Sequence, residues 1–323
     1  MAANGIDLFS GAGGFTTGAS EAGVNVLLAA NHWDAAVACH AANHPGVEHV
    51  QQDLAEMDWT LCPEADILLA SPACQGFSQA GQPARKGSGG SHSPDPARIR
   101  VKGQRDRNTS WAVLAAADTL RPRQIVIENV VDMMTAWDGF DAWLGVLQAF
   151  GYATHTHRIN AINYGGGQER ERLVVTANLG GPAIKLAPSL GLASPTIGDC
   201  LDADDAAGNR WHAIDSKPAR MQPLMAKAQR QAGGRCFWAN VSESRGRTLG
   251  EHFPTATTQS GTQWCLLDGD RVRVLNPREL ARSMSFPDSY KLPKQRELAG
   301  KLIGNAIDVN MARGIVGQVL AAA

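Results

Sequence analysis

The sequence lacks long apolar runs, the pattern of a secretory signal and any Cys-x-x-Cys spacing. No stretch approaches the ~20 apolar residues of a membrane-spanning helix, and the start, MAANGIDLF, has no basic stretch followed by an apolar one, as a secretory signal would. The six cysteines contain no Cys-x-x-Cys pair, which favours free thiols over disulfides or a zinc site. We therefore expect a cytoplasmic protein without a membrane association or a metal.

The chain also lacks net charge, but this average hides two basic segments. A net charge of −1 argues by itself against a nucleic-acid binder. Residues 85–107, however, hold seven Lys and Arg against two acids, and residues 209–247 hold eight against two. Two such segments on a neutral chain fit a surface that binds a polyanion, and the alternative is a pair of solvated loops.

Apolar strand-like segments alternate with helix-like ones over the first half of the chain. The predicted strands are 5–9, 24–30, 65–71, 124–129 and 172–179, and the predicted helices are 16–23, 34–44, 110–120 and 140–150. Apolar strands separated by helices indicate a sheet covered on both faces. The expected fold class is therefore α/β, with a doubly wound, mostly parallel sheet.

Two segments interrupt this alternation and suggest the domain organisation. Residues 79–107 are rich in Gly, Ser, Pro and Arg and read as a long loop, a feature that is often functional. Residues 180–270 lack the βα alternation, which indicates a separate, smaller domain. The helical residues 309–323 would pack back on the first domain. We expect a catalytic and cofactor-binding domain at 1–179, a second domain at 180–270, and a hinge and C-terminal segment at 271–323.

A glycine-rich turn, Asp7-Leu-Phe-Ser-Gly-Ala-Gly-Gly14, follows the first predicted strand. Glycines let the backbone approach a ligand closely and aim the next helix's N-terminus at it. In α/β sheets a nucleotide-like cofactor binds at this place. The spacing is not Gly-x-Gly-x-x-Gly, which disfavours a dinucleotide, and a purely structural turn is the alternative. Asp53, after a second βα unit, is placed to bind an adenine amino group.

Three further motifs carry groups suited to chemistry on a ring. Cys74 follows the predicted strand 65–71, and a thiolate there suits conjugate addition, although a lone cysteine more often only packs. Glu128 ends the strand 124–129 and can protonate or hydrogen-bond a ring nitrogen. Arg170 and Arg172, in the stretch QERER, share a strand face if it is extended, and a surface salt-bridge strip is the alternative.

The order of these motifs resembles one family. DLFSGAGGF, ACQGFS, IENV, QERER, RVRVLNPRELARSMSFPDSY and LIGNAI follow one another as in the DNA cytosine-5 methyltransferases, over residues 5–178 and 271–313. The resemblance implies a Rossmann-like fold that binds S-adenosyl-L-methionine and methylates carbon 5 of a cytosine in double-stranded DNA. A base inside a duplex must be flipped out before it can be reached.

The same resemblance implies roles for individual residues. Cys74 looks like the nucleophile that adds to C6, Glu128 like the group at N3, and Arg172, with Arg170, like the pair that holds the ring and phosphate. Residues 79–107 match the loop that closes over the flipped base, and 180–270 the target recognition domain. The implied cofactor positions are Phe9, Ser10, Gly11, Ala12, Gly13, His32, Trp33, Asp53, Leu54, Ser71, Asn305 and Ile307. The implied DNA contacts are Gln75, Ser78, Arg85, Lys86, Arg98, Arg100 and Gln168.

This chain departs from the family pattern at two positions. Ala73 stands before the nucleophile where the family usually has proline, and His32 stands where a glutamate usually binds the cofactor ribose. Two other functions remain open: a tRNA cytosine-5 methyltransferase and a catalytically inert DNA-binding relative. We expect a monomer that works beside a cognate restriction endonuclease, and the sequence offers no code for the site it recognises.

Overall fold

The chain forms two compact units. The computed structural model describes residues 2–73, 96–189, 192–206, 209–241 and 244–322, with side chains from Arg107 onward in the helix that begins at Pro96. The first unit comprises Met1–Ile159, Glu171–Pro188 and Ala312–Ala323, and the second Asn160–Arg170 and Ser189–Met311. This division reflects compactness, so the predicted functional domains 1–179, 180–270 and 271–323 stay a prediction.

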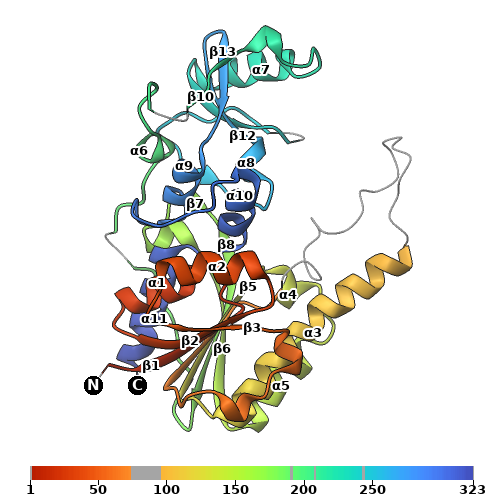
Figure 1. Ribbon diagram of the computed structural model, residues 1–323, viewed down its shortest axis with the longest axis vertical. Helices are drawn as coiled ribbons and strands as arrows, with labels where there is room; N and C mark the ends of the chain where they lie inside the picture. The colour runs from red at the N-terminus through yellow and green to blue at the C-terminus, as the bar shows by residue number, and fades with distance from the viewer. Residues whose placement is uncertain (1, 74–95, 190–191, 207–208, 242–243, 323) are drawn as a thin grey trace. The chain divides into compact units, whose positions relative to one another are not determined.

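The first unit is built on a seven-stranded sheet (Figure 1). In spatial order its strands are β3 (Glu48–Gln51), β2 (Asn25–Asn31), β1 (Asn4–Leu8), β4 (Ile67–Ala70), β5 (Gln124–Asn129), β8 (Glu171–Leu179) and β6 (Tyr152–Asn160). The first five are parallel to one another, and β8 is antiparallel to β5. The strand order reverses between β1 and β4, where ligands bind in open α/β sheets.

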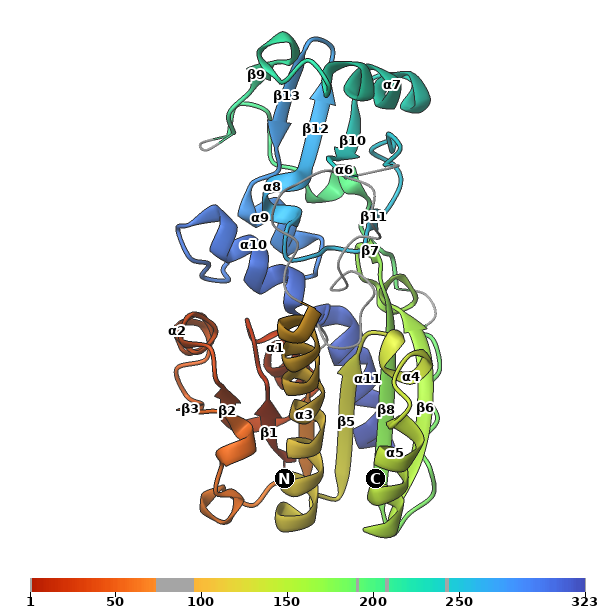
Figure 2. The ribbon, with the colours of Figure 1, turned by 90° about the vertical axis from the view of Figure 1, so that its right-hand side faces the viewer.

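Helices cover both faces of this sheet. Figure 2 shows α3 and α5 in front of the strands, with α1 and α11 behind them. On the α3 and α5 side, Val113 and Trp143 pack against Ile125 and other buried strand residues. The helices of this unit are α1 (Gly14–Glu21), α2 (Asp34–Asn43), α3 (Pro96–Leu120), α4 (Asp132–Thr135), α5 (Phe140–Ala149) and α11 (Val309–Ala321), with short 3₁₀ turns at Leu54–Glu56 and Trp59–Leu61. The predicted doubly wound α/β fold is confirmed.

The predicted strands and helices of the first half are all present, but one predicted loop is partly wrong. Residues 96–107, assigned to the loop 79–107, form the first turns of α3. Pro96 begins the helix, as proline often does at the first helical position, and the residues after it include good helix formers. The absence of an apolar stripe concealed the helix. Residues 79–95 lie outside the described residues.

The second unit contains a small antiparallel sheet. Its order is β10 (Cys236–Ala239), β12 (Trp264–Asp268), β13 (Arg271–Val274) and β9 (His212–Ala213). One face packs against α7 (Gln222–Ala232) through a core that includes Met225, Trp238 and Val272. Short antiparallel strands explain why residues 180–270 show no βα alternation. The unit also holds β7 (Gln168–Glu169), β11 (Phe253–Pro254), α6 (Ile197–Cys200), α8 (Ser260–Gln263), α9 (Pro277–Arg282) and α10 (Arg296–Asn305), with 3₁₀ turns at Ala161–Tyr164 and Ile214–Ser216.

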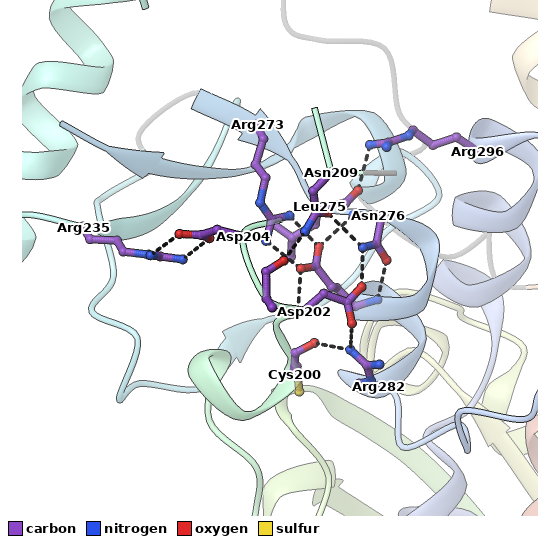
Figure 3. Close-up of polar contacts among 12 residues, drawn as sticks. Cys200, Asp202, Asp204, Asn209, Arg235, Arg273, Leu275, Asn276, Arg282 and Arg296 are labelled. Carbon is purple, nitrogen blue, oxygen red and sulfur yellow. Dashed lines mark hydrogen bonds and ion pairs between the residues drawn. The ribbon is translucent and has the colours of Figure 1, made fainter. Parts of the chain in front are cut away.

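A buried ion pair joins β13 to α9 in this unit. The two terminal nitrogens of Arg273 donate to the two carboxylate oxygens of Glu279 at 2.8 and 2.7 Å, and both side chains are fully buried. Glu279 also accepts bonds from the backbone N–H groups of Asn276 and Asp202. Figure 3 shows Arg273, Asn276 and Asp202 together with Arg282, which donates to Asp202 at 2.6 Å. The carboxylate of Glu279 therefore ties three segments together.

We predict that removal of Glu279 lowers the free energy of unfolding more than removal of Arg273. Glu279→Leu should lower the free energy of unfolding by about 3–5 kcal/mol, because it leaves a buried guanidinium without its partner. Arg273→Met should cost less, since the carboxylate keeps its two backbone donors. The double variant should be more stable than Glu279→Leu alone. Urea denaturation of the four proteins measures this, and a double variant less stable than either single one would contradict it.

Candidate active site

The turn after β1 has the conformation that its glycines predict. Gly11 and Gly13 have φ angles of 54° and 89°, in the left-handed region that favours glycine, and Gly13 caps the N-terminus of α1. Phe9 also has a positive φ, of 60°, which is uncommon for a non-glycine residue and often marks a functional site. Ser10 and Ala12 are buried within the turn. The turn thus places the N-terminus of α1 at the carboxyl end of β1.

Asp7 lies buried beneath this turn. Its Oδ2 accepts bonds from the backbone N–H and the hydroxyl of Thr16, at 3.2 and 2.7 Å. Its Oδ1 has no hydrogen-bond partner among the described residues. Burial raises the pKa of Asp7 to about 7, against the opposing effect of the bonds from Thr16. An unsatisfied acceptor at this position suits a ligand that carries a positive charge or a donor group.

The ends of β2 and β3 carry the next predicted cofactor residues. His32 is exposed, and Trp33, half-buried, donates its backbone N–H to the side chain of Asn31 at 3.0 Å. Asp53 is exposed and accepts a bond from the N–H of Ala55. Leu54, in contrast, has its side chain in the core, 2% exposed, so that only its backbone is available to a ligand.

Hydrogen bonds hold the segment after β4 on both sides. Ser71 donates its N–H to the carbonyl of Leu8, at 3.1 Å, beside the glycine turn. The side-chain amide of Asn129 donates to the carbonyl of Pro72 at 2.9 Å, and the N–H of Ala73 donates to the hydroxyl of Thr109 at 3.0 Å. Asn129 and Thr109 were not among the predicted site residues, and Thr109 carries no motif that could have identified it. The backbone is thus anchored up to the residue before Cys74.

Several predicted residues lie outside the part of the chain that the structure describes. They are Cys74, Gln75, Ser78, Arg85 and Lys86, together with the side chains of Arg98 and Arg100. Their predicted roles stay predictions. The other five cysteines are free thiols, as expected.

Glu128 and Arg172 form a buried ion pair. Nε of Arg172 lies 2.9 Å from Oε1 of Glu128, and the side chains are 10% and 8% exposed. The antiparallel register of β5 and β8, in which Asn129 faces Leu173, brings the two residues together. Arg172 also donates to the carbonyl of Glu171 at 2.6 Å. A carboxylate is thus fixed at the carboxyl end of β5, with its charge balanced by a single arginine.

Arg170 and Arg172 are both buried, with the exposed Glu171 between them, but they have different hydrogen-bond partners. The main chain leaves β7 at Glu169 and enters β8 only at Glu171. The guanidinium of Arg170 is buried in the second unit and donates to the carbonyls of Ala256, Gly304 and Ala306, at 2.8 to 3.2 Å. The burial pattern agrees with the predicted alternation, but the partners differ, because Arg170 bonds backbone carbonyls and Arg172 bonds the carboxylate of Glu128. The common role predicted for the two arginines stays a prediction.

Gln168 has a structural role in place of the predicted contact with DNA. Its side chain is fully buried, donates to the hydroxyl of Ser283 at 2.8 Å and accepts from the N–H of Ala256 at 2.8 Å. Asn305, at the end of α10, is exposed, and Ile307 is buried. Both belong to the second unit, and their predicted cofactor contacts stay a prediction.

The predicted site residues of the first unit that the structure describes therefore lie along one edge of the sheet. The turns after β1, β2, β3 and β4 and the end of β5 all follow parallel strands, whose carboxyl ends lie along the same edge. Within the described residues, no group of three or more His, Cys, Asp or Glu side chains is arranged to hold a metal ion. No described helix has the length and apolarity to cross a bilayer.

Comparison with known proteins gives one consistent result. The sequence profile of the C-5 cytosine-specific DNA methylases matches residues 3–321. The Type II methyltransferase M.NlaX of Neisseria lactamica is 28% identical over 98% of this chain and 96% of its own length. The Type II methyltransferase M.HhaI of Haemophilus parahaemolyticus is 26% identical over 97% and 93%.

A solved structure shares the fold. The S. pombe Dnmt2 methyltransferase superposes with a TM-score of 0.68 at 17% identity, over 99% of this chain and 98% of that one. The profile match covers residues 3–321, the motifs follow in order, and one sheet edge carries the glycine turn, Glu128 and Arg172. The chain belongs to the C-5 cytosine-specific DNA methylase family.

Proposed function

We propose that this DNA cytosine-5 methyltransferase works by covalent catalysis, with Cys74 as nucleophile and the Glu128–Arg172 pair as the group that holds the target cytosine. The buried ion pair is the observation that carries this proposal. A carboxylate fixed beside an arginine, at the sheet edge where the anchored segment before Cys74 also lies, suits recognition of a polar ring that enters the site.

The residues of the first unit fit S-adenosyl-L-methionine as the methyl donor. The left-handed glycines of the turn after β1 allow close approach of a ligand, and the unsatisfied oxygen of buried Asp7 suits a ligand with positive charge. Asp53 is exposed, and its carboxylate can accept a hydrogen bond from an amino group. When bound, this cofactor supplies an electrophilic methyl group on a positively charged sulfur.

The chain's own residues would activate the cytosine in sequence. The Cys74 thiolate forms a bond to C6, the electron pair of the C5=C6 double bond moves to C4–C5, and the pair of the C4=N3 double bond takes up a proton at N3 that protonated Glu128 delivers. The resulting enamine is nucleophilic at C5. Arg172 keeps Glu128 in position through the bond from Nε. After methyl transfer to C5, a water molecule takes up the C5 proton, the C5=C6 double bond re-forms as the Cys74 thiolate leaves C6, and the proton at N3 returns to Glu128.

Arg170 acts in this proposal as a positioning residue. Its bonds to three backbone carbonyls of the second unit fix the turn that leads into β8, two residues before Arg172. The expectation that Arg170 itself touches the cytosine or its phosphate is therefore replaced by an indirect role.

The proposal also covers the substrate, the oligomeric state, the cellular location and a partner enzyme. We propose that duplex DNA is the substrate, that the protein acts as a monomer on cellular DNA in the cytoplasm, and that a cognate restriction endonuclease cuts the same sequence. The support for the endonuclease is that M.NlaX and M.HhaI are both named Type II methyltransferases.

Replacing the nucleophile tests the covalent step. Cys74→Ser should abolish methyl transfer, because a neutral hydroxyl adds poorly to C6. Wild-type protein should form an adduct with 5-fluorocytosine DNA that survives SDS, since fluorine cannot leave as a proton does. Cys62→Ser, a matched change at a half-buried thiol of the same unit, should keep both properties. An adduct formed by Cys74→Ser would remove Cys74 from this role.

A second prediction compares the buried ion pair with an exposed one in the same unit. Arg172→Gln should lower kcat by at least about a hundredfold, the range of a lost acid–base contribution, and should also lower stability because Glu128 loses its buried partner. Arg158→Gln breaks a pair with Glu171 that is 59% and 50% exposed, and should change neither. Single-turnover kinetics and thermal unfolding measure both. Equal effects of the two substitutions would contradict a catalytic role for the buried pair.

The departure at His32 gives a third prediction. A neutral imidazole offers one acceptor nitrogen, whereas a carboxylate offers two oxygens and a negative charge. If His32 faces the cofactor ribose, His32→Glu should bind S-adenosyl-L-methionine about tenfold more tightly, the order expected for a charge-assisted bond. His32→Gln, which adds an acceptor without a charge, should lie between the two. Calorimetric titration decides, and identical affinities of all three proteins would place His32 outside the cofactor site.

A further inference from the structure

A chain of hydrogen bonds leads from Asp7, beneath the glycine turn, to His49 of β3 within the first unit. Oγ1 of Thr16 lies 2.7 Å from Oδ2 of Asp7 and 2.9 Å from Nε2 of His40. Nδ1 of the same histidine lies 2.8 Å from Nε2 of His49. The first three side chains are fully buried, whereas His49 is partly exposed. An unbroken row of groups that exchange protons therefore connects a buried carboxyl group with solvent.

The sheet register explains how the two ends of this chain are placed. Asp7 of β1 pairs with Ala29 of β2, and Ala29 pairs with His49 of β3, so that Asp7 and His49 face the same side of the sheet, two strands apart. Adjacent strands are about 4.8 Å apart, which puts the two side chains beyond direct hydrogen-bond distance. Thr16 of α1 and His40 of α2 complete the path, and the ring nitrogens of His40 bond in opposite directions.

Burial sets which of these groups carries a charge. It raises the pKa of Asp7 to about 7, against the bonds from Thr16, so that this carboxyl group titrates near neutral pH. Burial, with the charges that His44 and His49 would carry, lowers the pKa of His40 to about 3. Burial also lowers the pKa of His44, to about 4, and that of His49. His40 therefore stays neutral over the range in which Asp7 titrates.

The chain can run in two directions, because a hydroxyl and a neutral imidazole each donate one hydrogen bond and accept another. With Asp7 ionised, Thr16 donates to Asp7, and Nε2–H of His40 donates to Thr16. Nδ1 of His40 then accepts from Nε2–H of His49. With Asp7 protonated, each donor becomes an acceptor, and His40 carries its proton on Nδ1. The charge of Asp7 thus determines the tautomer of His40.

We propose that Thr16, His40 and His49 form a proton relay, through which buried Asp7 loses its proton to solvent when the positively charged cofactor binds at the glycine turn. Three protons each move by one bond: from Oδ2 of Asp7 to Oγ1 of Thr16, from this hydroxyl to Nε2 of His40, and from Nδ1 of His40 to Nε2 of His49. His49 becomes an imidazolium and releases its Nδ1 proton to water. Asp7 is left as a carboxylate.

The relay gives the cofactor site a negative charge only when it is needed. Oδ1 of Asp7 has no hydrogen-bond partner among the described residues, and a positive charge nearby favours the ionised form. Since Asp7 is fully buried, its proton must leave through exchangeable groups or by local opening of the fold. The inference rests on the proposed function and deepens it, because it assigns positioning residues to the cofactor site.

A neighbouring pair of side chains offers a matched comparison. The hydroxyl of Thr17 donates to the carbonyl of Gly13 at 2.7 Å and lies 3.2 Å from Nε2 of His44. This pair also joins α1 to the end of α2, but it leads to a carbonyl, which has no proton to exchange. Thr17 and His44 therefore provide controls for Thr16 and His40.

Nitrogen-15 NMR of the histidine side chains in the cofactor-free protein tests the relay. Between about pH 6 and about pH 8, on either side of the pKa of Asp7, the proton of His40 should move from Nδ1 to Nε2. Its midpoint should coincide with the ionisation of Asp7, followed by carbon-13 NMR of the carboxyl group. A wild-type His40 that keeps one tautomer throughout would overturn the relay.

Three variants locate the path. Asp7→Asn should hold His40 as the Nε2–H tautomer at every pH, because an amide oxygen accepts from Thr16 as a carboxylate does. Thr16→Val should uncouple His40 from Asp7 and raise the pKa of Asp7, since the hydroxyl bond lowers it. Thr17→Val loses the same hydroxyl one residue later and should keep the tautomer change. Thermal unfolding verifies that each variant is folded, and equal behaviour of the two valine variants would contradict the path.

Calorimetry in buffers of different ionisation enthalpy counts the protons released when S-adenosyl-L-methionine binds. At about pH 6 the wild type should release close to one proton more than Asp7→Asn, because Asp7 is then about nine-tenths protonated. At about pH 8 the difference should nearly vanish. Comparison with Asp7→Asn removes the contribution of other groups such as His32. His44→Gln should release as many protons as the wild type.

The outcomes separate this inference from the function on which it rests. If the cofactor binds and the wild type and Asp7→Asn release equal numbers of protons at both pH values, the inference fails and the proposed function stands. If the wild type binds no S-adenosyl-L-methionine, the proposed function fails, and the NMR titration still decides whether the relay exists.

Discussion

The buried ion pair between Glu128 and Arg172 is the interaction on which the account of this site depends. Two charges that are each about nine-tenths buried are costly unless they are paired. The antiparallel pairing of β5 with β8, within a sheet that is otherwise parallel from β3 to β5, places the arginine beside the glutamate. A carboxylate held in this way keeps a fixed position for a polar ring, which a solvated glutamate on a loop would not.

The parallel strands impose a second constraint, because their carboxyl ends must meet at one edge. The glycine turn after β1 and the anchored Ser71–Pro72–Ala73 segment after β4 lie on either side of the point where the strand order reverses. Cofactor binding and nucleophilic attack can therefore use neighbouring loops on one rigid sheet. The second unit has a different construction, with a fully buried arginine–glutamate pair between β13 and α9.

The sequence predicted the elements whose burial is complete and missed those that depend on tertiary context. The strands ILLA and QIVIEN are buried on both faces and so appear as apolar runs, whereas β6, YATHTHRIN, is largely half-buried and has no such run. Glu128 and Arg172 were each identified by their motifs, but their contact is set by strand register. Adjacency in QERER suggested that Arg170 acts with Arg172, and it could not reveal that the chain passes from one unit to the other between them.

The central claim is that the protein methylates carbon 5 of cytosine in duplex DNA. Mass spectrometry of nucleosides, after the purified protein is incubated with S-adenosyl-L-methionine and either duplex DNA or tRNA, tests it most directly. The account predicts 5-methylcytosine in the DNA and none in the tRNA. Methylation of tRNA alone, or of neither nucleic acid, would contradict it.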